Sequence, residues 1–231
     1  MAQILPLARS ASEAVPARRG EIIAATAEAI FRQGYGTASM RDIADALGIT
    51  QAALYYHFTN KEEILFTIID GFTDRLEATL RAEFEGDYDP AAGLRRAIRA
   101  HILMTETYYR EIKIVMEDNK FLSPARRVAI TAKEDAIFRL YRARVEALIA
   151  SGRGREIAPT PAAFALLGVI NYFYHWFRPG KGMSLAEVAD QSIDLLLNGL
   201  LKPGRKRGGR IAIAPRSNRP TKNRKTKGRT T

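Results

Sequence analysis

The stretch TASMRDIADALGITQAALYYHFTNKEEIL occupies residues 37–65 and carries the start and stop signals of short helices. Ser39 and Asp42 form a capping box, in which each side chain can satisfy a free amide at a helix start. Apolar residues then follow at the i, i+3, i+4, i+7 spacing of a core-facing stripe, and Gly48 supplies the stop. The pattern predicts a helix over residues 40–47.

A second short helix is predicted over residues 51–57, directly after the turn Gly48-Ile49-Thr50, with Thr50 as its N-cap. Two short helices joined in this way are typical of a helix-turn-helix, whose second helix enters the major groove of DNA. A large residue at the start of that helix would hold it away from the base edges. Gln51 can bond an adenine edge bidentately, and Ala52 or Ala53 can touch a thymine methyl group.

The residues around this helix offer contacts to the DNA backbone. Tyr55, Tyr56 and His57 carry donors that can reach phosphates on either side of the groove. Free amides at a helix start can receive a phosphate near Thr37 and Ser39, and Lys61 does the same at the next helix. Packing, a surface histidine or a solvated lysine would explain the same residues, but the complete motif favours DNA contact. The candidate DNA-contacting residues are Thr37, Ser39, Arg41, Thr50, Gln51, Ala52, Ala53, Tyr55, Tyr56, His57 and Lys61.

The rest of the chain repeats helical start and stop signals, and the short run 211–213 offers the one candidate strand. The predicted fold class is therefore all-α, with about nine helices. Start signals are expected near Ala17, Asp89-Pro90, Ser123-Pro124, Thr160-Pro161 and Ser184. Four segments are predicted: a flexible arm over 1–16, a helix-turn-helix domain over 17–65, a ligand-binding and dimerisation domain over 66–201, and a disordered basic tail over 202–231.

Charge is distributed unevenly along the 231 residues, whose formal net charge is +11. Twelve of the 36 basic residues lie in Lys202–Thr231, which has no acidic residue, so residues 1–201 hold 24 basic against 25 acidic side chains. Residues 1–70 hold six basic and eight acidic side chains. If that region binds DNA, it must therefore do so through a few well-placed hydrogen-bond donors rather than through a general positive field.

Composition excludes several protein classes. The apolar content of 46% supplies a core, cysteine is absent, and no run of eighteen apolar residues or secretory signal occurs, so we expect a soluble, cytoplasmic protein without a membrane partner. The three histidines are widely separated, and neither a metal-ligand repeat nor a nucleophile elbow is present. We therefore expect that the protein is not an enzyme and that it binds neither a metal ion nor a cofactor.

Residues 37–50 together with Leu54–Leu65 resemble the tetracycline-repressor (TetR) family, and the likeness covers about residues 17–70. The resemblance implies a dimeric, all-helical regulator whose first three helices bind a palindromic operator and whose fourth helix leads to a ligand domain. By the family pattern, positions 51–53 read bases, Tyr55, Tyr56 and His57 contact the backbone and groove edge, and Lys61 meets a phosphate. Gln51-Ala52 stands where many relatives carry Lys or Arg plus Gly, which leaves the operator sequence open.

A second resemblance concerns Gly168–Gly182, which is similar to the C-terminal domains of TetR-family regulators that sense acyl-CoA thioesters. It implies a small-molecule effector, an acyl-CoA or another apolar ligand, in a pocket whose phosphate-bearing end meets arginines. Aromatic residues at helical spacing are more often core or interface, and the arginines can equally form surface ion pairs. The candidate ligand residues are Tyr108, Phe138, Arg139, Tyr141, Arg142, Asn171, Tyr172, His175, Trp176 and Arg178.

Partners follow from this interpretation: a double-stranded DNA operator and a second copy of the chain. The last two helices, about 161–178 and 184–201, are expected to form the homodimer interface, with leucines from Leu195 to Leu201 supplying its area. The function predicted is a transcriptional repressor released by its ligand. The alternative is an architectural nucleic-acid-binding protein acting through the basic tail, which would lose DNA binding if residues 203–231 were deleted.

Overall fold

The computed structural model of the protein describes residues 11–85, 89–178, 180 and 182–201, with side chains from Ala17 onward. The predicted basic tail, including the run 211–213, lies outside the described residues. Within them the chain is all-helical, as predicted, and its one β-bridge pairs Gly154 with Leu201. The helices are α1 (Ala11–Gln33), α2 (Met40–Ala46), α3 (Gln51–His57), α4 (Lys61–Phe84), α5 (Pro90–Thr107), α6 (Tyr109–Asp118), α7 (Pro124–Ala150), α8 (Pro159–Asn171), α9 (Phe173–Trp176) and α10 (Leu185–Leu200), with a 3₁₀ turn over Asn119–Phe121.

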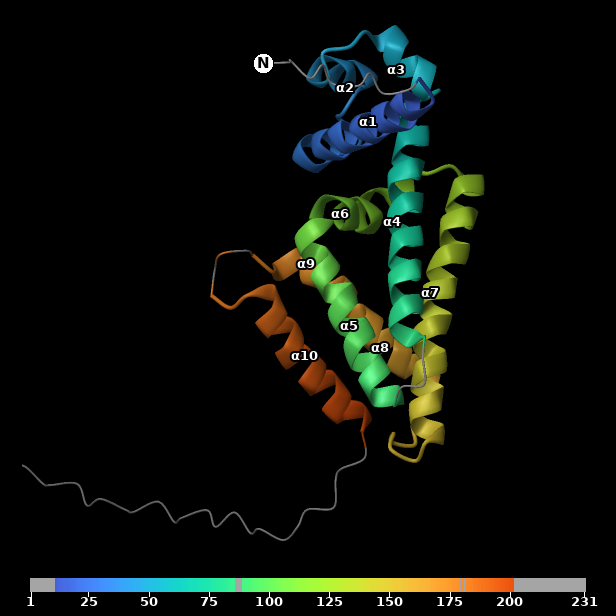
Figure 1. Cartoon of the computed structure of the whole chain (residues 1–231), viewed down its shortest axis with the longest axis vertical. Coiled ribbons are helices and arrows are strands. Elements are labelled where there is room, and N and C mark those ends of the chain that lie inside the picture. Colours follow the sequence, from blue (N-terminus) through green and yellow to red (C-terminus); the bar gives the residue numbers. More distant parts are fainter. Residues whose placement is uncertain (1–10, 86–88, 179, 181, 202–231) are drawn as a thin grey trace, which may run out of the picture.

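Helices α1–α3 form a head at one end of the molecule, and α4 runs from this head down into the body (Figure 1). The predicted capping box is confirmed, since the Ser39 side chain accepts from the Asp42 amide and the Asp42 side chain accepts from the Ser39 amide. Thr50 accepts from the amide of Ala53 at 3.1 Å and so begins α3. Gly48, in the turn between α2 and α3, has φ +62°, a conformation that favours glycine.

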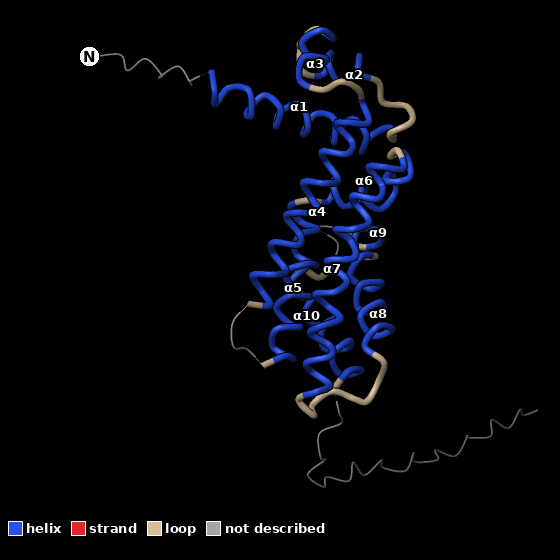
Figure 2. Tube along the Cα trace, turned by 90° about the vertical axis from the view of Figure 1, so that its right-hand side faces the viewer, coloured by secondary structure: helices blue, strands red, loops and turns tan. Residues whose placement is uncertain are grey.

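The body is built around α4, which packs against α5 and α7, while α8 packs on α7 and α10 lies along α5. Figure 2 shows the body continuing along the same long axis, away from the head. The buried apolar side chains run continuously from the head into the body, for example Leu54 in α3, Ile69 in α4, Leu94 in α5 and Val145 in α7. Head and body therefore share one connected core, and α4 contributes buried side chains to it in both parts.

Two predicted boundaries are wrong. Helix α1 begins at Ala11 instead of Ala17, so residues 11–16 belong to a helix and not to a flexible arm; Ala and Glu in this stretch favour helix. The helix expected over 161–178 starts at Pro159 and is interrupted at Tyr172, which adds the four-residue α9. The Tyr172 amide donates to the Val169 carbonyl in a tight turn. No helix start or stop residue in the sequence marks this interruption.

No helix within the described ranges is long and apolar enough to cross a membrane.

Candidate functional site

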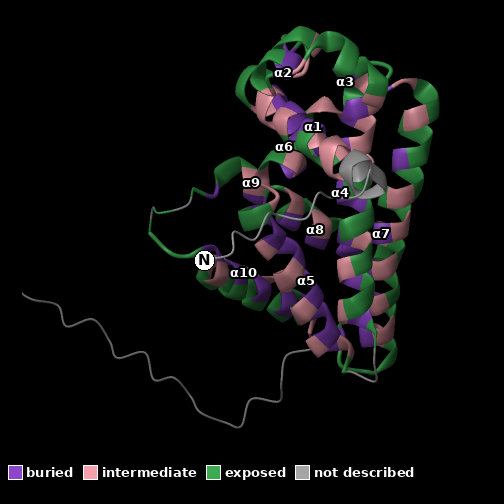
Figure 3. Cartoon of the chain, turned by 45° about the horizontal axis from the view of Figure 1, so that its top comes forward, coloured by how far each residue is buried: buried purple, intermediate pink, exposed green. Residues whose placement is uncertain are grey.

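The outer face of α3 is open to solvent, as a helix that reads DNA requires. Gln51, Ala52 and Ala53 are exposed, and the Tyr55 and Tyr56 side chains are 49% and 79% exposed. Figure 3 shows exposed residues over the outer surface of α2 and α3. The inner side is anchored by Leu54 and Phe58, both almost fully buried. Further exposed residues beside α3 are Thr37, Ser39, Arg41 and Thr50.

Lys61 differs from the other candidates because its ammonium is turned inward. Nζ donates to the carbonyl oxygens of Tyr35 and Ala38, each at 2.6 Å, and lies 4.1 Å from the centroid of the Tyr35 ring. Desolvation lowers the pKa of Lys61. The sequence predicts a phosphate contact for this lysine, whereas the structure shows that it ties the start of α4 to the loop before α2.

Arg19 of α1 likewise joins parts of the head. Its guanidinium donates to the His57 carbonyl at the end of α3 and stacks 4.0 Å from the centroid of the Phe58 ring. It also pairs with Glu63 of α4 at 3.7 Å. Arg19 therefore fixes α3 against α1 and α4, which sets the angle at which α3 is presented.

Helix α6 connects the head to the body. On its outer side Arg110 forms an ion pair with Glu28 of α1, and the Tyr109 ring meets the Phe31 ring edge to face at 5.7 Å. Lys113 lies 5.0 Å from the centroid of the same Phe31 ring. Helix α1 of the head therefore rests on α6 through these contacts.

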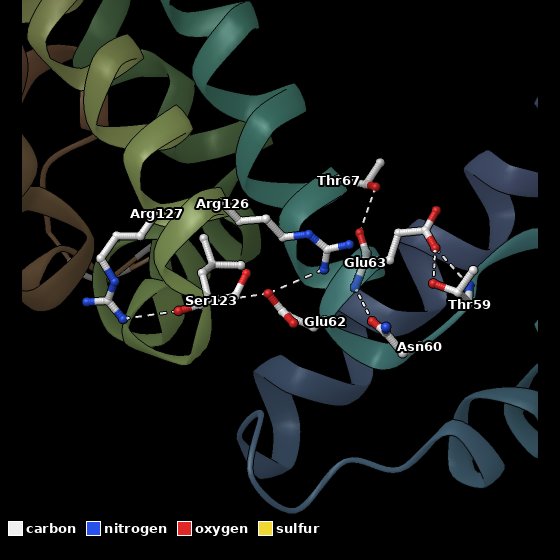
Figure 4. Close-up of polar contacts among 9 residues, drawn as sticks. Thr59, Asn60, Glu62, Glu63, Thr67, Ser123, Arg126 and Arg127 are labelled. Atoms are coloured by element: carbon white, nitrogen blue, oxygen red, sulfur yellow. Dashed lines mark hydrogen bonds and ion pairs between the residues drawn. The ribbon is translucent and has the colours of Figure 1, made fainter.

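A polar cluster forms a further connection, between the first turns of α4 and α7 (Figure 4). The Glu62 carboxylate accepts from the Ser123 amide at 2.8 Å and pairs with Arg126 at 3.4 Å. Nη1 of Arg126 is buried and makes no hydrogen bond to any described residue, so Glu62 is what compensates its charge. The hydrogen bonds from Ser123 are the main cause that lowers the pKa of Glu62.

A cavity of about 580 Å³ lies in the body between α4, α5, α6, α7, α8 and α9. This volume suits a small organic ligand. Among the residues that the structure describes, the wall is mainly apolar and includes no lysine or arginine. It consists of Phe72, Thr73, Leu76, His101, Thr105, Ile112, Val115, Met116, Glu134, Asp135, Ile137, Phe138, Phe164, Leu167, Gly168, Ile170, Asn171 and Tyr174.

The polar part of the cavity centres on α5. His101 is 7% exposed, and its Nδ1 lies 3.2 Å from the hydroxyl oxygen of Tyr141, which is fully buried. Burial lowers the pKa of His101 to about 4, so the imidazole is neutral at pH 7. Across the cavity on α7, burial and then the neighbouring Asp135 raise the pKa of Glu134.

Comparison with known proteins covers both halves of the chain. Residues 22–68 match the model of bacterial regulatory proteins of the tetR family, and residues 87–200 match the tetracyclin repressor-like C-terminal domain. The crystal structure of PfmR, a TetR family transcriptional regulator from Thermus thermophilus, is 35% identical with a TM-score of 0.73, covering 77% of this chain and 97% of PfmR. The chain belongs to the TetR family.

Two further TetR-family relatives are informative. The transcriptional repressor KstR2 of Rhodococcus jostii (strain RHA1) is 28% identical over 188 residues, which cover 80% of this chain and 92% of KstR2. AibR, solved in complex with isovaleryl coenzyme A and operator DNA, is 28% identical with a TM-score of 0.72, covering 77% of this chain and 97% of AibR. As a TetR-family member the protein is a DNA-binding transcriptional regulator, as the sequence predicts.

Only part of the predicted ligand set lies on the main cavity. Phe138 and Asn171 line it, whereas Tyr141 stands behind His101 and is fully buried. Arg142 pairs with Glu146 at 2.8 Å, as the surface alternative expected. Tyr108, between α5 and α6, packs near Phe72 and is not part of the wall. Arg139, on α7, and Arg178, after α9, line two smaller cavities. Tyr172, His175 and Trp176, where α8 is interrupted, are exposed.

Sequence reasoning missed the polar wall residues His101, Thr105, Glu134 and Asp135. A signal for two of them was present, because His101 and Thr105 fall seven and eleven residues after Leu94, on the apolar stripe of α5. A polar residue at a core-facing position of a helix needs a partner or a cavity. The acidic pair on α7 gave no such signal.

Proposed function

We propose that the protein is a homodimeric repressor that leaves its operator when a small apolar molecule or an acyl thioester fills the main cavity. The observation that carries this proposal is the double role of α4 and α6. Phe72, Thr73 and Leu76 of α4 line the cavity, and so do Ile112, Val115 and Met116 of α6. Both helices also hold the head, so a ligand that displaces either changes the placement of α3.

Release then follows as a shift between two arrangements of the molecule. The empty protein places its two heads at the spacing of successive major grooves, roughly 34–36 Å apart or one further turn. A ligand that fits the cavity better in the other arrangement favours it by the difference between its two affinities. The name of KstR2, a repressor, supports this direction of control, and AibR, solved with isovaleryl coenzyme A and operator DNA, supports an acyl-CoA as the class of effector.

For an acyl-CoA, the acyl chain would occupy the apolar cavity and the phosphates would lie outside it. The described residues of the wall offer no cation to a phosphate, and Glu134 and Asp135 would repel one. A smaller cavity of about 370 Å³ shares Thr105 with the main one and is lined by Arg110 and Arg178. Arg178, a predicted ligand residue, supports a phosphate-bearing end on that side.

For DNA contact we propose the exposed residues of the head. Gln51, Ala52 and Ala53 face the bases, and Tyr55, Tyr56 and the half-buried His57 reach the backbone, supported by the open face of α3. Thr37, Ser39, Thr50 and Arg41 border the same surface. Two of the three donors of the Lys61 ammonium are used by the Tyr35 and Ala38 carbonyls, so we propose a structural role for Lys61 in place of the phosphate contact that the sequence predicts. A bacterial operator lies in the cytoplasm, so the protein acts there.

For dimerisation we propose α8 and α10. Ala165, Gly168, Val169 and Tyr172 are exposed and follow one another at helical spacing along α8. Small residues there let a partner helix approach closely. On α10 Leu195 is 77% exposed, while Leu197 and Leu200 are buried in their own chain, so the expectation that all these leucines supply the interface is wrong.

Selection of bound fragments from random DNA tests the first step. A palindromic site is expected, and binding without any sequence preference would overturn the proposal. Acyl-CoAs of increasing chain length are then added to the protein–operator complex, with free coenzyme A as the control that lacks the acyl group. Release by a subset of the thioesters, but not by free coenzyme A, is the expected result.

A further inference from the structure

We propose that the main cavity selects apolar molecules that carry an uncharged carbonyl oxygen, and that His101 recognises this oxygen by donating a hydrogen bond to it. This inference rests on the proposed function, because it assumes that the cavity binds the effector. It adds the chemical group that distinguishes the effector from a plain hydrocarbon, and it names the residue responsible.

The position of His101 is unusual for a core residue. It lies on the face of α5 that carries the buried Leu94, Ile98 and Ile102, and it belongs to the cavity wall while being only 7% exposed. Nδ1 is engaged by Tyr141, and Nε2 has no hydrogen-bond partner among the described residues. An imidazole nitrogen in a cavity wall without a protein partner is available to a polar group of a ligand in the cavity.

The Tyr141 hydroxyl determines which ring nitrogen carries the proton. Its hydrogen has two acceptors within reach: Nδ1 of His101 at 3.2 Å and the Ala97 carbonyl at 3.5 Å. Nδ1 is the nearer of the two acceptors, so in the arrangement that we infer the hydroxyl donates to Nδ1 and the proton of the neutral imidazole lies on Nε2. In the alternative arrangement the hydroxyl donates to the Ala97 carbonyl and Nδ1 keeps the proton, which would leave Nε2 as an acceptor. In the first arrangement His101 presents a donor to the cavity, and Tyr141 is its positioning residue.

Neighbouring polar groups extend this donor into a site for one oxygen atom. Thr105 follows His101 by one helical turn, is 5% exposed, and its hydroxyl makes no hydrogen bond to another described residue. Asn171 reaches the same cavity from the last turn of α8. The remaining wall is largely apolar, so a ligand oxygen finds its partners at this end.

Charge in the cavity restricts the oxygen to an uncharged group. Among the described residues, the wall includes Glu134 and Asp135, both exposed on its α7 side, and no basic residue, and the His101 imidazole is neutral at pH 7. A ligand carboxylate bound beside His101 would lose its hydration without any cation to pair with. A ketone, ester or thioester carbonyl accepts from His101 without this penalty.

A matched pair of probes separates the hydrogen bond from apolar burial. Valerophenone and pentylbenzene have the same skeleton, with a carbonyl in the first where the second has a methylene. Their affinities for the full-length dimer are measured by calorimetry for the parent and for His101→Leu. Hydration of the free probes cancels when the ketone-to-hydrocarbon affinity ratio is compared between the two proteins. The ratio is expected to fall about threefold to tenfold in His101→Leu, the size of one hydrogen bond.

Leu167→Ala is the control variant, because Leu167 lines the same cavity but offers no hydrogen bond. It should weaken both probes alike and leave the ratio unchanged. An unchanged ratio in His101→Leu, or failure of the parent to bind valerophenone, would overturn the inference. Operator release by an acyl-CoA in the parent would still support the proposed function, so the two failures are distinguishable.

Nuclear magnetic resonance tests the same bond in the parent protein, where no variant has to fold. The chain has only three histidines, so nitrogen-15 labelling of the imidazoles gives few signals. His101 should show the Nε2–H form at pH 7, and valerophenone should shift that signal while pentylbenzene should not. Tyr141→Phe should release the tautomer preference and lower the ketone ratio. A parent signal with the proton on Nδ1 would contradict the proposal.

Discussion

The backbone amide of Ser123 donates a hydrogen bond of 2.8 Å to the carboxylate of Glu62. This contact joins the first turn of α4, next to the DNA-binding head, to the N-terminus of α7, whose middle lines the cavity with Ile137 and Phe138. Together with the contacts of α6 on α1, it makes the head part of the same packed unit as the cavity wall. Ligand control therefore has a physical route through helices that both regions share.

Glu62→Gln should uncouple this route at a moderate cost in stability. Gln keeps an oxygen that can accept from the Ser123 amide but removes the charge that compensates the buried Nη1 of Arg126, so the free energy of unfolding should fall by about 1–3 kcal/mol. The ratio of operator affinities without and with a releasing acyl-CoA should fall about 2-fold to 30-fold, the range of coupling changes along such contacts. Glu77→Gln is the matched control, since Glu77 pairs with Arg81 inside α4. Equal coupling in both variants would show that the cluster plays no part.

Substitutions in α3 should separate base reading from backbone contact. Tyr56→Ala should reduce affinity for all DNA sequences, because a phosphate contact carries no sequence information. Gln51→Ala should instead relax the preference at one base pair, with a loss of discrimination of about 1–3 kcal/mol. Binding to the selected operator and to single-base variants, measured by fluorescence anisotropy at fixed salt, distinguishes the two. Parent-like binding by both variants would make the contact assignment wrong.

Lys61 and Arg41 should respond differently to salt. Lys61→Met leaves the Tyr35 and Ala38 carbonyls without their donor, so it should lower stability by about 1–3 kcal/mol. It should weaken operator binding without changing the slope of log affinity against log salt. Arg41→Met should reduce that slope by about 0.9 for each lost phosphate contact, hence by about 2 for a dimer. A slope change in Lys61→Met equal to that in Arg41→Met would restore the phosphate contact that the sequence predicts for Lys61.

Leu195→Glu should convert the dimer into a monomer. Leu195 is 77% exposed in the single chain, so the substitution should leave the monomer folded while placing a charge in the proposed interface. Sedimentation velocity reports the mass, and operator affinity should collapse because two linked half-sites can no longer be bound together. Val128→Glu on α7 is the control, at 70% exposure. A dimeric Leu195→Glu protein would exclude this face of α10 from the interface.

The parts of the fold that sequence predicts are those set by neighbouring residues. Ser39, Thr50, Asn60 and Ser184 each cap a helix through an amide three positions on, so their role is visible in a short window. The break at Tyr172 has no such local marker.

The residues of the candidate site also divide into those that the sequence could predict and those that it could not. The open face of α3 is a property of one helix, and its residues could be named in advance. The cavity is assembled from six helices, so its wall depends on how they pack, and only Phe138 and Asn171 of the predicted set reach it. Lys61 shows the limit most clearly, because the direction of its side chain is fixed by the Tyr35 and Ala38 carbonyls, more than twenty residues away in sequence.

The free energy of unfolding should fall as the pH is lowered, and His101 should account for part of this loss. Burial lowers the pKa of His101 to about 4, whereas an unfolded histidine titrates near 6.5. Above about pH 6.5 both states are neutral and the folded state keeps its full stability. As the pH falls toward 4 the unfolded state takes up a proton that the folded state refuses, so unfolding becomes easier. Between pH 7 and pH 5 the cost is about 2 kcal/mol.

Urea unfolding of the parent and of His101→Leu at both pH values measures this contribution. The carboxylates and the other two histidines are common to both proteins, so their effects cancel in the comparison. The parent should lose about 2 kcal/mol more than the variant on going from pH 7 to pH 5. Equal losses would mean that the imidazole of His101 is not held neutral, and the donor assigned to Nε2 would then lose its basis, because a charged imidazole donates from both nitrogens.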